Sequence, residues 1–385
     1  MALDAETRLQ LIETVRRFVR EKCIPIEAKV AEEDRVPDEI VAEMRALGLF
    51  GLSIPEEYGG LGLSMEEEVL VGFELGHTSP AFRSVIGTNV GIGSQGVVMF
   101  GNEAQKSEWL PKLASGEVVA SFALTEPGAG SDAASLKTRA IRAKDSGGDD
   151  YVVNGTKRFI TNAARAGMFT LLARTDPAKK GASGISAFIV PASTPGITIG
   201  KPEMKMGQQG AHISDVIFEN ARVPARLRLG NEGEGFKVAM QVLDRGRLHI
   251  SSVCVGVAER LIDEAVAYAR TREQFGQRIG DFQLVQAMLA DCKTEAYAAR
   301  CMVLDAARKR DAGEVVTLEA ACTKYFASEM VGRVADRAVQ IFGGAGYVAD
   351  YGIERFYRDV RIFRIYEGTS QIQQLVIARN LLKGD

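Results

Sequence analysis

Tyr151-Val-Val-Asn-Gly-Thr-Lys-Arg-Phe-Ile160 is a strand-like stretch in a chain whose two ends have helical patterns. Its Asn154-Gly155 pair lies between two strand-forming runs, which is a strong signal for a β-hairpin turn. Glycine and proline residues separate it from three further strand-like runs, Phe169–Ala173, Ile185–Val190 and Asp215–Phe218. The middle of the chain, residues 121–233, is therefore predicted to be an antiparallel β domain.

Apolar residues recur at helical spacing on both sides of this region. In residues 1–120 the repeat includes Leu9, Ile12, Val15 and Val19, which predicts an N-terminal helical domain. The C-terminal part is predicted to contain four longer helices, at about Gly235–Arg270, Phe282–Ala312, Leu318–Phe342 and Ser370–Leu382. Long helices with broad apolar faces are typical of bundles, so residues 234–385 are predicted to form a C-terminal four-helix bundle. The fold class is α+β, in the order α, β, α.

Composition excludes several classes of function. The net charge is −3 over 385 residues, so no excess of basic residues indicates nucleic-acid binding. No apolar run is long enough for membrane insertion. The five cysteines are scattered without a CxxC pair, which predicts reduced thiols and no metal site. The N-terminus resembles neither a signal nor a transit peptide, so we expect a bacterial cytoplasmic protein, or a mitochondrial matrix protein in processed form.

Glu367 is the strongest candidate for a catalytic group. It is a lone carboxylate in Arg361-Ile-Phe-Arg-Ile-Tyr-Glu-Gly-Thr-Ser-Gln371, between an apolar and a small polar stretch. Burial near a turn would raise its pKa and make it a better proton acceptor. The chain has only three histidines, which favours a carboxylate as general base. The alternative is an acidic residue at the start of the helix at Ser370, stabilised by the helix dipole.

Three glycine-rich segments suggest ligand loops. Gly91-Ile-Gly-Ser-Gln-Gly96 matches a dinucleotide fingerprint, but no strand precedes it and no βαβ pattern follows, so a close helix contact or space for a ligand is favoured. Thr125-Glu-Pro-Gly-Ala-Gly-Ser-Asp132 follows a strand-like run and offers backbone N–H groups to a polar ligand, or else is a simple turn. Phe342-Gly-Gly-Ala-Gly-Tyr347 is a third loop or a helix C-cap. Arg272, just past a long helix, is either a phosphate clamp or a solvated cation.

Taken together, five segments resemble the acyl-CoA dehydrogenase family over essentially the whole chain. They are Phe122–Asp132, Asn154–Asn162, Arg272–Gly276, Gln340–Gly344 and Ile365–Ser370. The resemblance implies a homotetrameric flavoenzyme that binds FAD between the β domain and the C-terminal helices. Its substrate would be an acyl-CoA, its product the trans-2-enoyl-CoA, and its electron acceptor electron transfer flavoprotein.

The resemblance also implies a role for each matching residue. Glu367 would be the base that removes the α-proton while a hydride passes from the β-carbon to flavin N5. The Glu367 N–H and an FAD hydroxyl would hold the thioester oxygen. The substrate would contact Ser131, Asp244, Arg247 and Gly368, although Asp244 and Arg247 could instead form a surface ion pair. The cofactor would be bound by Phe122, Ala123, Leu124, Thr125, Ser131, Phe159, Ile160, Thr161, Arg272, Gln274, Phe282, Gln283, Gln340, Ile341, Phe342, Gly343, Gly344, Thr369 and Gln371.

Two positions depart from the family pattern. Some relatives carry the base one residue before the arginine that matches Arg247, where this chain has Gly246. An arginine common near residues 207–211 is missing here, and the neighbouring His212 is expected to be structural.

The substrate and reaction type are predicted less directly. Small residues at 87, 91, 93 and 94 favour a medium, long or branched acyl chain over butyryl. The alternatives are an oxygen-using acyl-CoA oxidase on the same fold and a non-catalytic helical scaffold or binding protein.

Overall fold

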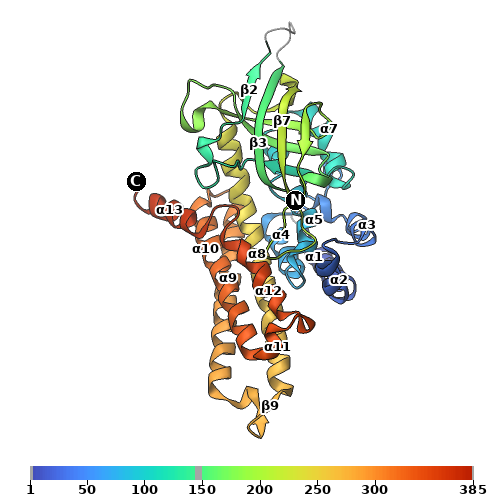
Figure 1. Ribbon diagram of the computed structural model, residues 1–385, viewed down its shortest axis with the longest axis vertical. Coiled ribbons are helices and arrows are strands. Elements are labelled where there is room, and N and C mark those ends of the chain that lie inside the picture. The colour runs from blue at the N-terminus through green and yellow to red at the C-terminus, as the bar shows by residue number, and fades with distance from the viewer. Residues whose placement is uncertain (1–2, 144–149, 384–385) are drawn as a thin grey trace.

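A computed structural model of the protein describes residues 3–143 and 150–383. Helices from the N-terminal part lie to one side, a sheet lies at one end, and long helices extend away from the sheet (Figure 1). No helix among the described residues has both the length and the apolar content to span a bilayer. The order α, β, α predicted from the sequence is confirmed.

The N-terminal part consists of short helices with well-defined starts. Ser64 caps α4 in a reciprocal arrangement with Glu67, and Asn102 caps α7 in the same way with Gln105. The helices are α1 (Ala5–Phe18), α2 (Glu27–Glu33), α3 (Asp38–Ala46), α4 (Met65–Leu75), α5 (Pro80–Val90), α6 (Gln95–Phe100) and α7 (Glu103–Ala114).

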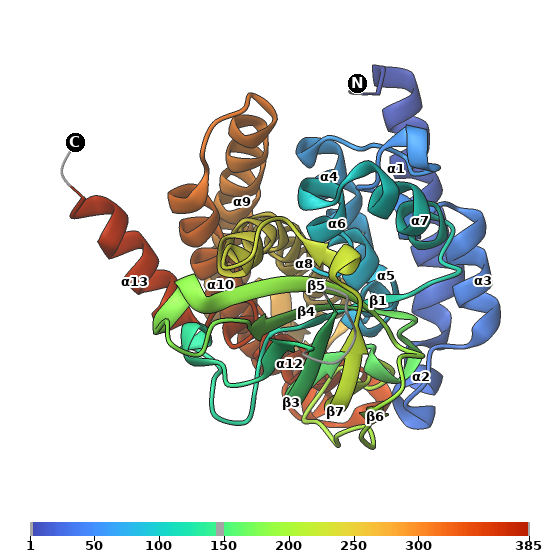
Figure 2. The same cartoon turned by 90° about the horizontal axis from the view of Figure 1, so that it is seen from above.

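The middle part is an eight-stranded sheet with the order β6-β7-β3-β2-β4-β5-β8, and β1 pairs with β4 (Figure 2). Its strands are β1 (Ala120–Ala123), β2 (Arg139–Arg142), β3 (Tyr151–Thr161), β4 (Met168–Arg174), β5 (Ile185–Pro191), β6 (Ile197–Ile199), β7 (Ile213–Val223) and β8 (Arg228–Leu229). Most neighbours are antiparallel, as predicted, but β1 and β2 both pair with β4 in parallel. The chain returns to β4 through long connections rather than tight turns, which allows these parallel pairs.

The predicted hairpin at Asn154-Gly155 is wrong, because β3 continues through it as one strand. The register against β7 shifts between Val153 and Gly155, so the pair lies at a β-bulge. Gly155 has a φ of 150°, and a Cβ atom there would lie 2.5 Å from Thr138 Oγ1. The glycine therefore permits close backbone approach beside β2. The Asn154 side chain hydrogen-bonds with Asn220 on β7 rather than making a turn.

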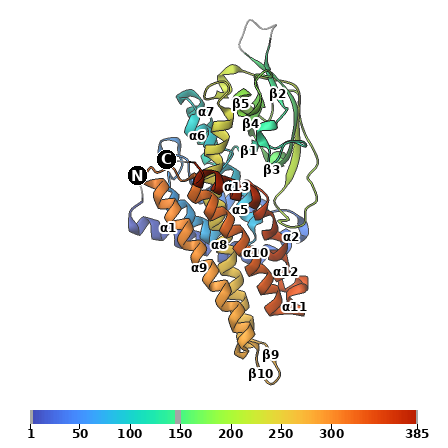
Figure 3. The ribbon, with the colours of Figure 1, turned by 90° about the vertical axis from the view of Figure 1, so that its left-hand side faces the viewer.

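The long C-terminal helices form as predicted, within a few residues at each end. α8 extends from the sheet to the far tip of the molecule, beside α9 and α10 (Figure 3). At a rise of 1.5 Å per residue it is about 55 Å long. The helices are α8 (Gly235–Thr271), α9 (Gln283–Asp311), α10 (Thr317–Phe342) and α13 (Ser370–Leu381), with short α11 (Gly344–Tyr347) and α12 (Ile353–Asp359) between the last two, and a tip hairpin of β9 (Glu273–Gln274) and β10 (Gln277–Arg278).

Buried apolar side chains form three clusters. One lies mainly within the N-terminal helices, one surrounds the sheet, and one lies between α4 and the C-terminal helices. This distribution supports our proposal of three domains, over residues 1–120, 121–233 and 234–385.

Candidate active site

Glu367 lies in a tight backbone turn between the 3₁₀ segment Val360–Arg364 and α13. It has a φ of 54° and Gly368 has a φ of 89°, so two successive residues are left-handed. The N-cap of α13 is Thr369, whose side chain accepts a hydrogen bond from Ile372 N at 3.2 Å. Glu367 therefore lies outside the first turn of the helix. The reading of it as a helix-start acid does not fit this geometry.

The Glu367 carboxylate is held in an environment that raises its pKa. The residue keeps some accessible surface, but its Oε2 atom is buried and has no hydrogen-bond partner among the described residues. Burial raises the pKa of Glu367, and the cations Arg83, Lys324 and Arg247 oppose this, in that order of strength. A buried carboxylate with a free oxygen and a raised pKa is suited to accept a proton.

The long helix α8 provides space for this carboxylate at one position. A Cβ atom added at Gly246 would lie 2.6 Å from Glu367 Oε2 and 3.2 Å from Ile92 Cγ2. Any side chain at this position would displace the Glu367 carboxylate and would also crowd Ile92. The glycine at position 246, where some relatives carry the base, thus leaves the space that the Glu367 carboxylate occupies.

The backbone of the turn is fixed through its carbonyl groups. Lys324 Nζ donates to the Gly368 carbonyl at 2.6 Å, and Gln373 Nε2 donates to the carbonyls of Glu367 and Gly368 at 3.0 and 3.1 Å. Burial lowers the pKa of Lys324 to about 8, although the nearby Glu367 carboxylate partly opposes this. The Glu367 N–H makes no hydrogen bond to the described residues. It is therefore available to an external acceptor.

Asp244 and Arg247 form an ion pair on α8 next to the turn. Arg247 Nη1 lies 2.6 Å from Asp244 Oδ1, and Thr317 Oγ1 donates to the other Asp244 oxygen at 2.8 Å. The pair expected as the alternative to substrate binding is present. It is largely buried rather than on the surface, and Arg247 Nε also approaches the Glu367 carbonyl at 3.5 Å.

Three family descriptions match consecutive parts of the chain. They are the N-terminal domain of acyl-CoA dehydrogenase over residues 5–117, the middle domain over 121–221 and the C-terminal domain over 233–382. The chain belongs to the acyl-CoA dehydrogenase family.

Whole-length relatives agree with this assignment. The acryloyl-CoA reductase (NADH) of Anaerotignum propionicum is 44% identical over 368 residues, covering 96% of this chain and 92% of the relative. An acyl-CoA dehydrogenase of Bacillus subtilis is 41% identical over 379 residues, covering 98% and 99%. The solved butyryl-CoA dehydrogenase of Megasphaera elsdenii has a TM-score of 0.94 at 36% identity, with both chains fully covered. This chain is an FAD-dependent oxidoreductase acting on CH–CH groups, and the FAD prediction is confirmed.

Two strands of this acyl-CoA dehydrogenase bring the first group of predicted cofactor residues together. Arg158 N donates to Thr125 O at 2.8 Å, which joins the segment Phe122–Thr125 to Phe159–Thr161. Phe159 has a φ of 57° and is 52% exposed, unusual for a phenylalanine in a strand. An exposed ring at this place fits a flat ligand such as the FAD ring system. Ser131 lies exposed on the loop that follows β1.

A buried ion pair stabilises the junction between the segments Phe122–Thr125 and Phe159–Thr161. Lys157 is fully buried, and its Nζ atom lies 2.8 Å from Glu126 Oε1 and 3.0 Å from the Leu124 carbonyl. The Glu126 carboxylate also accepts from the backbone N–H groups of Lys137 and Thr138. These bonds fix the start of the Thr125–Asp132 loop against residues 137–138.

The other predicted cofactor residues form two further groups, at different places in the structure. Thr369 and Gln371 border a cavity of about 220 Å³ together with Arg361 and Arg364. A third group lies at the bundle tip, far from the sheet, where the rings of Tyr268 and Phe342 stack at 4.1 Å. It comprises Arg272, Gln274, Phe282, Gln283, Gln340, Ile341, Phe342, Gly343 and Gly344. One copy of the chain therefore does not unite the first and third groups.

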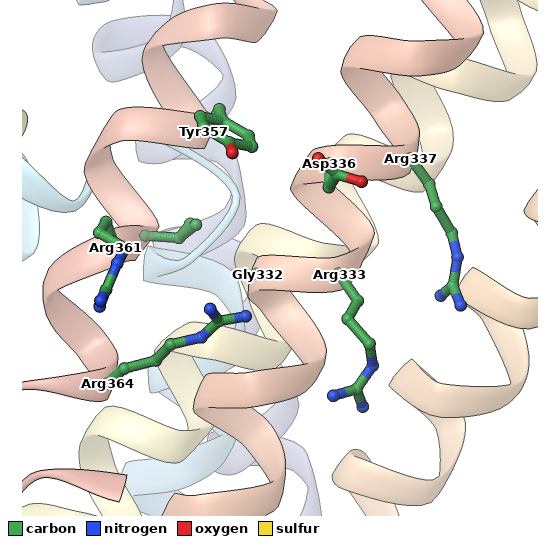
Figure 4. A pocket seen from close by; sticks show the side chains of 8 residues that line it. Gly332, Arg333, Asp336, Arg337, Tyr357, Arg361 and Arg364 are labelled. Atoms are coloured by element: carbon green, nitrogen blue, oxygen red, sulfur yellow. The ribbon is translucent and has the colours of Figure 1, made fainter.

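An arginine-rich cavity of about 400 Å³ lies between α10 and the segment Tyr357–Arg364 (Figure 4). Arg333 and Arg337 point from α10 toward α9 and pair with Glu295 at 2.6 and 2.8 Å. Arg364 pairs with Glu329 at 3.1 Å. Three of the four arginines that line the cavity are thus already paired with carboxylates.

Sequence reasoning missed Arg83, Lys324 and the Lys157–Glu126 pair. Each is an ordinary charged residue whose burial depends on contacts far away in the sequence. The weak signal was a single cation within a run of small or apolar residues, as at Lys324 in Ala320-Ala-Cys-Thr-Lys-Tyr-Phe326. His212, expected to be structural, lies with its Nε2 atom 2.7 Å from the Asp34 carbonyl.

Proposed function

We propose that this enzyme converts an acyl-CoA thioester to the trans-2-enoyl-CoA, with Glu367 as the base for the α-proton. The observation that carries this proposal is the buried Glu367 Oε2 atom, which has no partner among the described residues. When bound, FAD supplies the oxidant that accepts the hydride from the β-carbon. Glu367 takes the proton from the α-carbon, and the electrons of that C–H bond form the new double bond.

The same turn is proposed to stabilise the thioester oxygen. Negative charge develops on this oxygen as the α-proton leaves, so a fixed donor lowers the barrier. The free Glu367 N–H is such a donor, and it is held by the bonds from Lys324 and Gln373 to the adjacent carbonyls. Gly368 completes the turn with a φ that favours glycine. We assign it, with Ser131, Asp244 and Arg247, to the substrate side.

The three cofactor groups are proposed to meet in an oligomer. The residues from Phe122 to Thr161 would hold the ring system and diphosphate, and Thr369 and Gln371 would hold the adenine side. The bundle-tip group lies at the opposite end of α8, so it would reach the FAD of a neighbouring copy. This arrangement supports the homotetramer that the resemblance implies.

Electron transfer flavoprotein is the proposed electron acceptor. The caffeyl-CoA reductase–Etf complex subunit of Acetobacterium woodii is 41% identical over 376 residues, covering 97% of this chain and 98% of the relative. The relatives named here are bacterial, which supports a bacterial cytoplasmic enzyme.

The direction of the reaction has a second candidate, because several relatives are named reductases. The same site would then run in reverse, with protonated Glu367 donating its proton to the α-carbon of an enoyl thioester. The raised pKa of Glu367 suits both directions. The redox partner would select between them.

The expectation of a medium, long or branched acyl chain gains no support from the small residues on which it rested. A Cβ atom at Gly93 would lie 2.8 Å from Ala120 Cβ, and the buried Ser94 hydroxyl bonds the Asn89 carbonyl. These residues allow close packing rather than an open channel. Solved relatives include butyryl-CoA dehydrogenase and a glutaryl-CoA dehydrogenase bound to glutaryl-CoA, so relatedness does not select one chain length.

The test is an anaerobic titration of the FAD-loaded enzyme with saturated acyl-CoAs of different lengths, following the visible flavin band. We expect bleaching by one class of acyl-CoA, rapid reoxidation by electron transfer flavoprotein and slow reoxidation in air. Fast reoxidation by oxygen would favour the oxidase alternative. A holoenzyme that no acyl-CoA bleaches, but that enoyl-CoA reoxidises after chemical reduction, would favour the reductase direction.

A further inference from the structure

A buried guanidinium group without a carboxylate partner lies near the proposed base. Arg83 on α5 is only 8% exposed. Among the described residues its one hydrogen bond is from Nε to His249 Nε2, at 3.0 Å, and no carboxylate oxygen lies within 4.0 Å of its nitrogen atoms. Its terminal atoms Nη1 and Nη2 are not among the fully enclosed polar atoms that lack a partner, so they face accessible space. Buried cations are normally paired, which makes this one unusual.

The orientation of Arg83 is fixed by a chain of buried polar groups. An arginine Nε can only donate, so His249 Nε2 must accept, and its Nδ1–H then donates to Glu68 Oε1 at 2.9 Å. Burial lowers the pKa of His249, which favours this neutral tautomer. Arg245 contacts the other Glu68 oxygen. Because the Glu68 carboxylate is paired with Arg245, no carboxylate in this network balances the positive charge of Arg83.

Arg83 and Glu367 face the same part of α8. Gly246, where a side chain would meet Glu367, and His249, which holds Arg83, lie three residues apart on that helix, about 4.5 Å along its axis. The Arg83 guanidinium lies over Gly87 on its own helix, where an added Cβ atom would be 2.8 Å from Arg83 Cζ. Arg83 is also the cation that acts most strongly on Glu367. The Arg83 guanidinium therefore lies within reach of an acyl chain whose α-carbon meets Glu367.

We propose that Arg83 binds a carboxylate at the far end of the acyl chain, so that the enzyme selects ω-carboxyacyl-CoA thioesters. The proposal rests on the function proposed above. The two terminal nitrogen atoms of a guanidinium match the two oxygen atoms of a carboxylate in a bidentate pair. A purely apolar acyl chain would leave this buried charge unpaired.

The experiment compares acyl-CoAs of equal carbon number with and without the terminal carboxylate. Glutaryl-CoA is paired with pentanoyl-CoA, and adipyl-CoA with hexanoyl-CoA. Initial rates of flavin reduction with the FAD-loaded enzyme give kcat/KM for each. We expect a preference for the carboxylated member of at least one pair by about 10- to 100-fold, the range of hydrogen bonds to charged groups.

Variants at Arg83 assign that preference. Arg83→Gln is expected to remove it, through a higher KM for the carboxylated substrate. Loss of the cation near Glu367 lowers the rate with both members of a pair alike, so the ratio within each pair reports the contact with the terminal carboxylate. Arg83→Lys, which keeps the charge but not the bidentate geometry, is expected to retain part of it. Arg226→Gln, at an exposed ion pair remote from the site, is the matched control and is expected to retain the full preference. If Arg83→Gln does not fold, the kcat/KM ratios of the wild-type enzyme and of Arg83→Lys still test the proposal.

Each other outcome overturns the proposal. Equal rates for both members of each pair, or a preference for the uncharged one, would remove the selection while leaving the dehydrogenase function intact. A preference retained in Arg83→Gln would place the carboxylate elsewhere. If that retained preference is accompanied by an activity that, as the pH is lowered, declines at higher pH than in wild type, Arg83 acts on Glu367 alone. Failure of every acyl-CoA to bleach the enzyme would refute the underlying function as well.

Discussion

The contact between Gly246 and Glu367 gives a sharp prediction for Gly246→Ala. The added methyl group would lie 2.6 Å from Glu367 Oε2, so the carboxylate must move by roughly 0.8 Å to regain an ordinary contact. A misplacement of about 1 Å in a catalytic group lowers a rate by about 100-fold, equivalent to about 2.7 kcal/mol. We therefore expect flavin reduction to slow by roughly that factor.

The effect on stability is expected to be smaller than the effect on rate. Overpacking costs about 1–3 kcal/mol, but alanine is favoured over glycine within a helix by about 1 kcal/mol. The variant should therefore fold and retain FAD. This separates it from a variant whose activity falls because the protein is lost.

The assay is anaerobic stopped-flow reduction of the flavin by the best acyl-CoA, at matched FAD content. Gly200→Ala is the control, because a Cβ atom there would make only ordinary contacts, the nearest at 3.4 Å with Asp215 Cβ. It should reduce at the wild-type rate. A Gly246→Ala rate within threefold of wild type would refute the argument that this glycine makes room for the base.

Two further variants test the groups that support the site. Lys324→Met removes the bond to the Gly368 carbonyl and a cation that lowers the pKa of Glu367, so we expect kcat/KM to fall about tenfold and its acid limb to move to higher pH. The profiles should converge in shape above pH of about 8, where wild-type Lys324 loses its charge; an unmoved acid limb would count against the coupling. Lys157→Met leaves the Glu126 carboxylate buried without its cation, which should lower stability by about 3–5 kcal/mol, measured by urea denaturation, and release FAD more readily. Lys29→Met, at an exposed ion pair with Glu33, should cost less than about 1 kcal/mol, and equal midpoints for the two variants would contradict the reasoning.

Sequence periodicity predicted the helices well because their stripes of apolar residues are local information. The ends of α8, α9, α10 and α13 lie within a few residues of the predicted ones. The hairpin turn predicted at Asn154-Gly155 is wrong for the opposite reason. Its local preference for a turn is outweighed by pairing of β3 with β7 and by the close approach of Thr138, which no local pattern encodes.

The candidate site likewise has a part that the sequence predicted and a part that it did not. Glu367 could be selected from its flanking residues and the resemblance, but its environment depends on three cations from α5, α8 and α10. The hydrogen-bonded chain of Arg83, His249 and Glu68 joins three helices across more than 160 residues of sequence. A single sequence carries no signal that these residues are in contact. Long-range packing, rather than composition, decides which charged residues are buried.

The most direct test of the central claim is the rate of flavin reduction in Glu367→Gln at FAD content equal to wild type. Glutamine keeps the size of the side chain and the backbone turn but cannot accept the proton. The account predicts a rate lower by at least about 100-fold, and up to about 10,000-fold, because a positioned base contributes on this scale. Substrate binding, followed by the shift of the flavin band, should persist. A Glu367→Gln enzyme that reduces its flavin within tenfold of the wild-type rate would show that another group removes the α-proton.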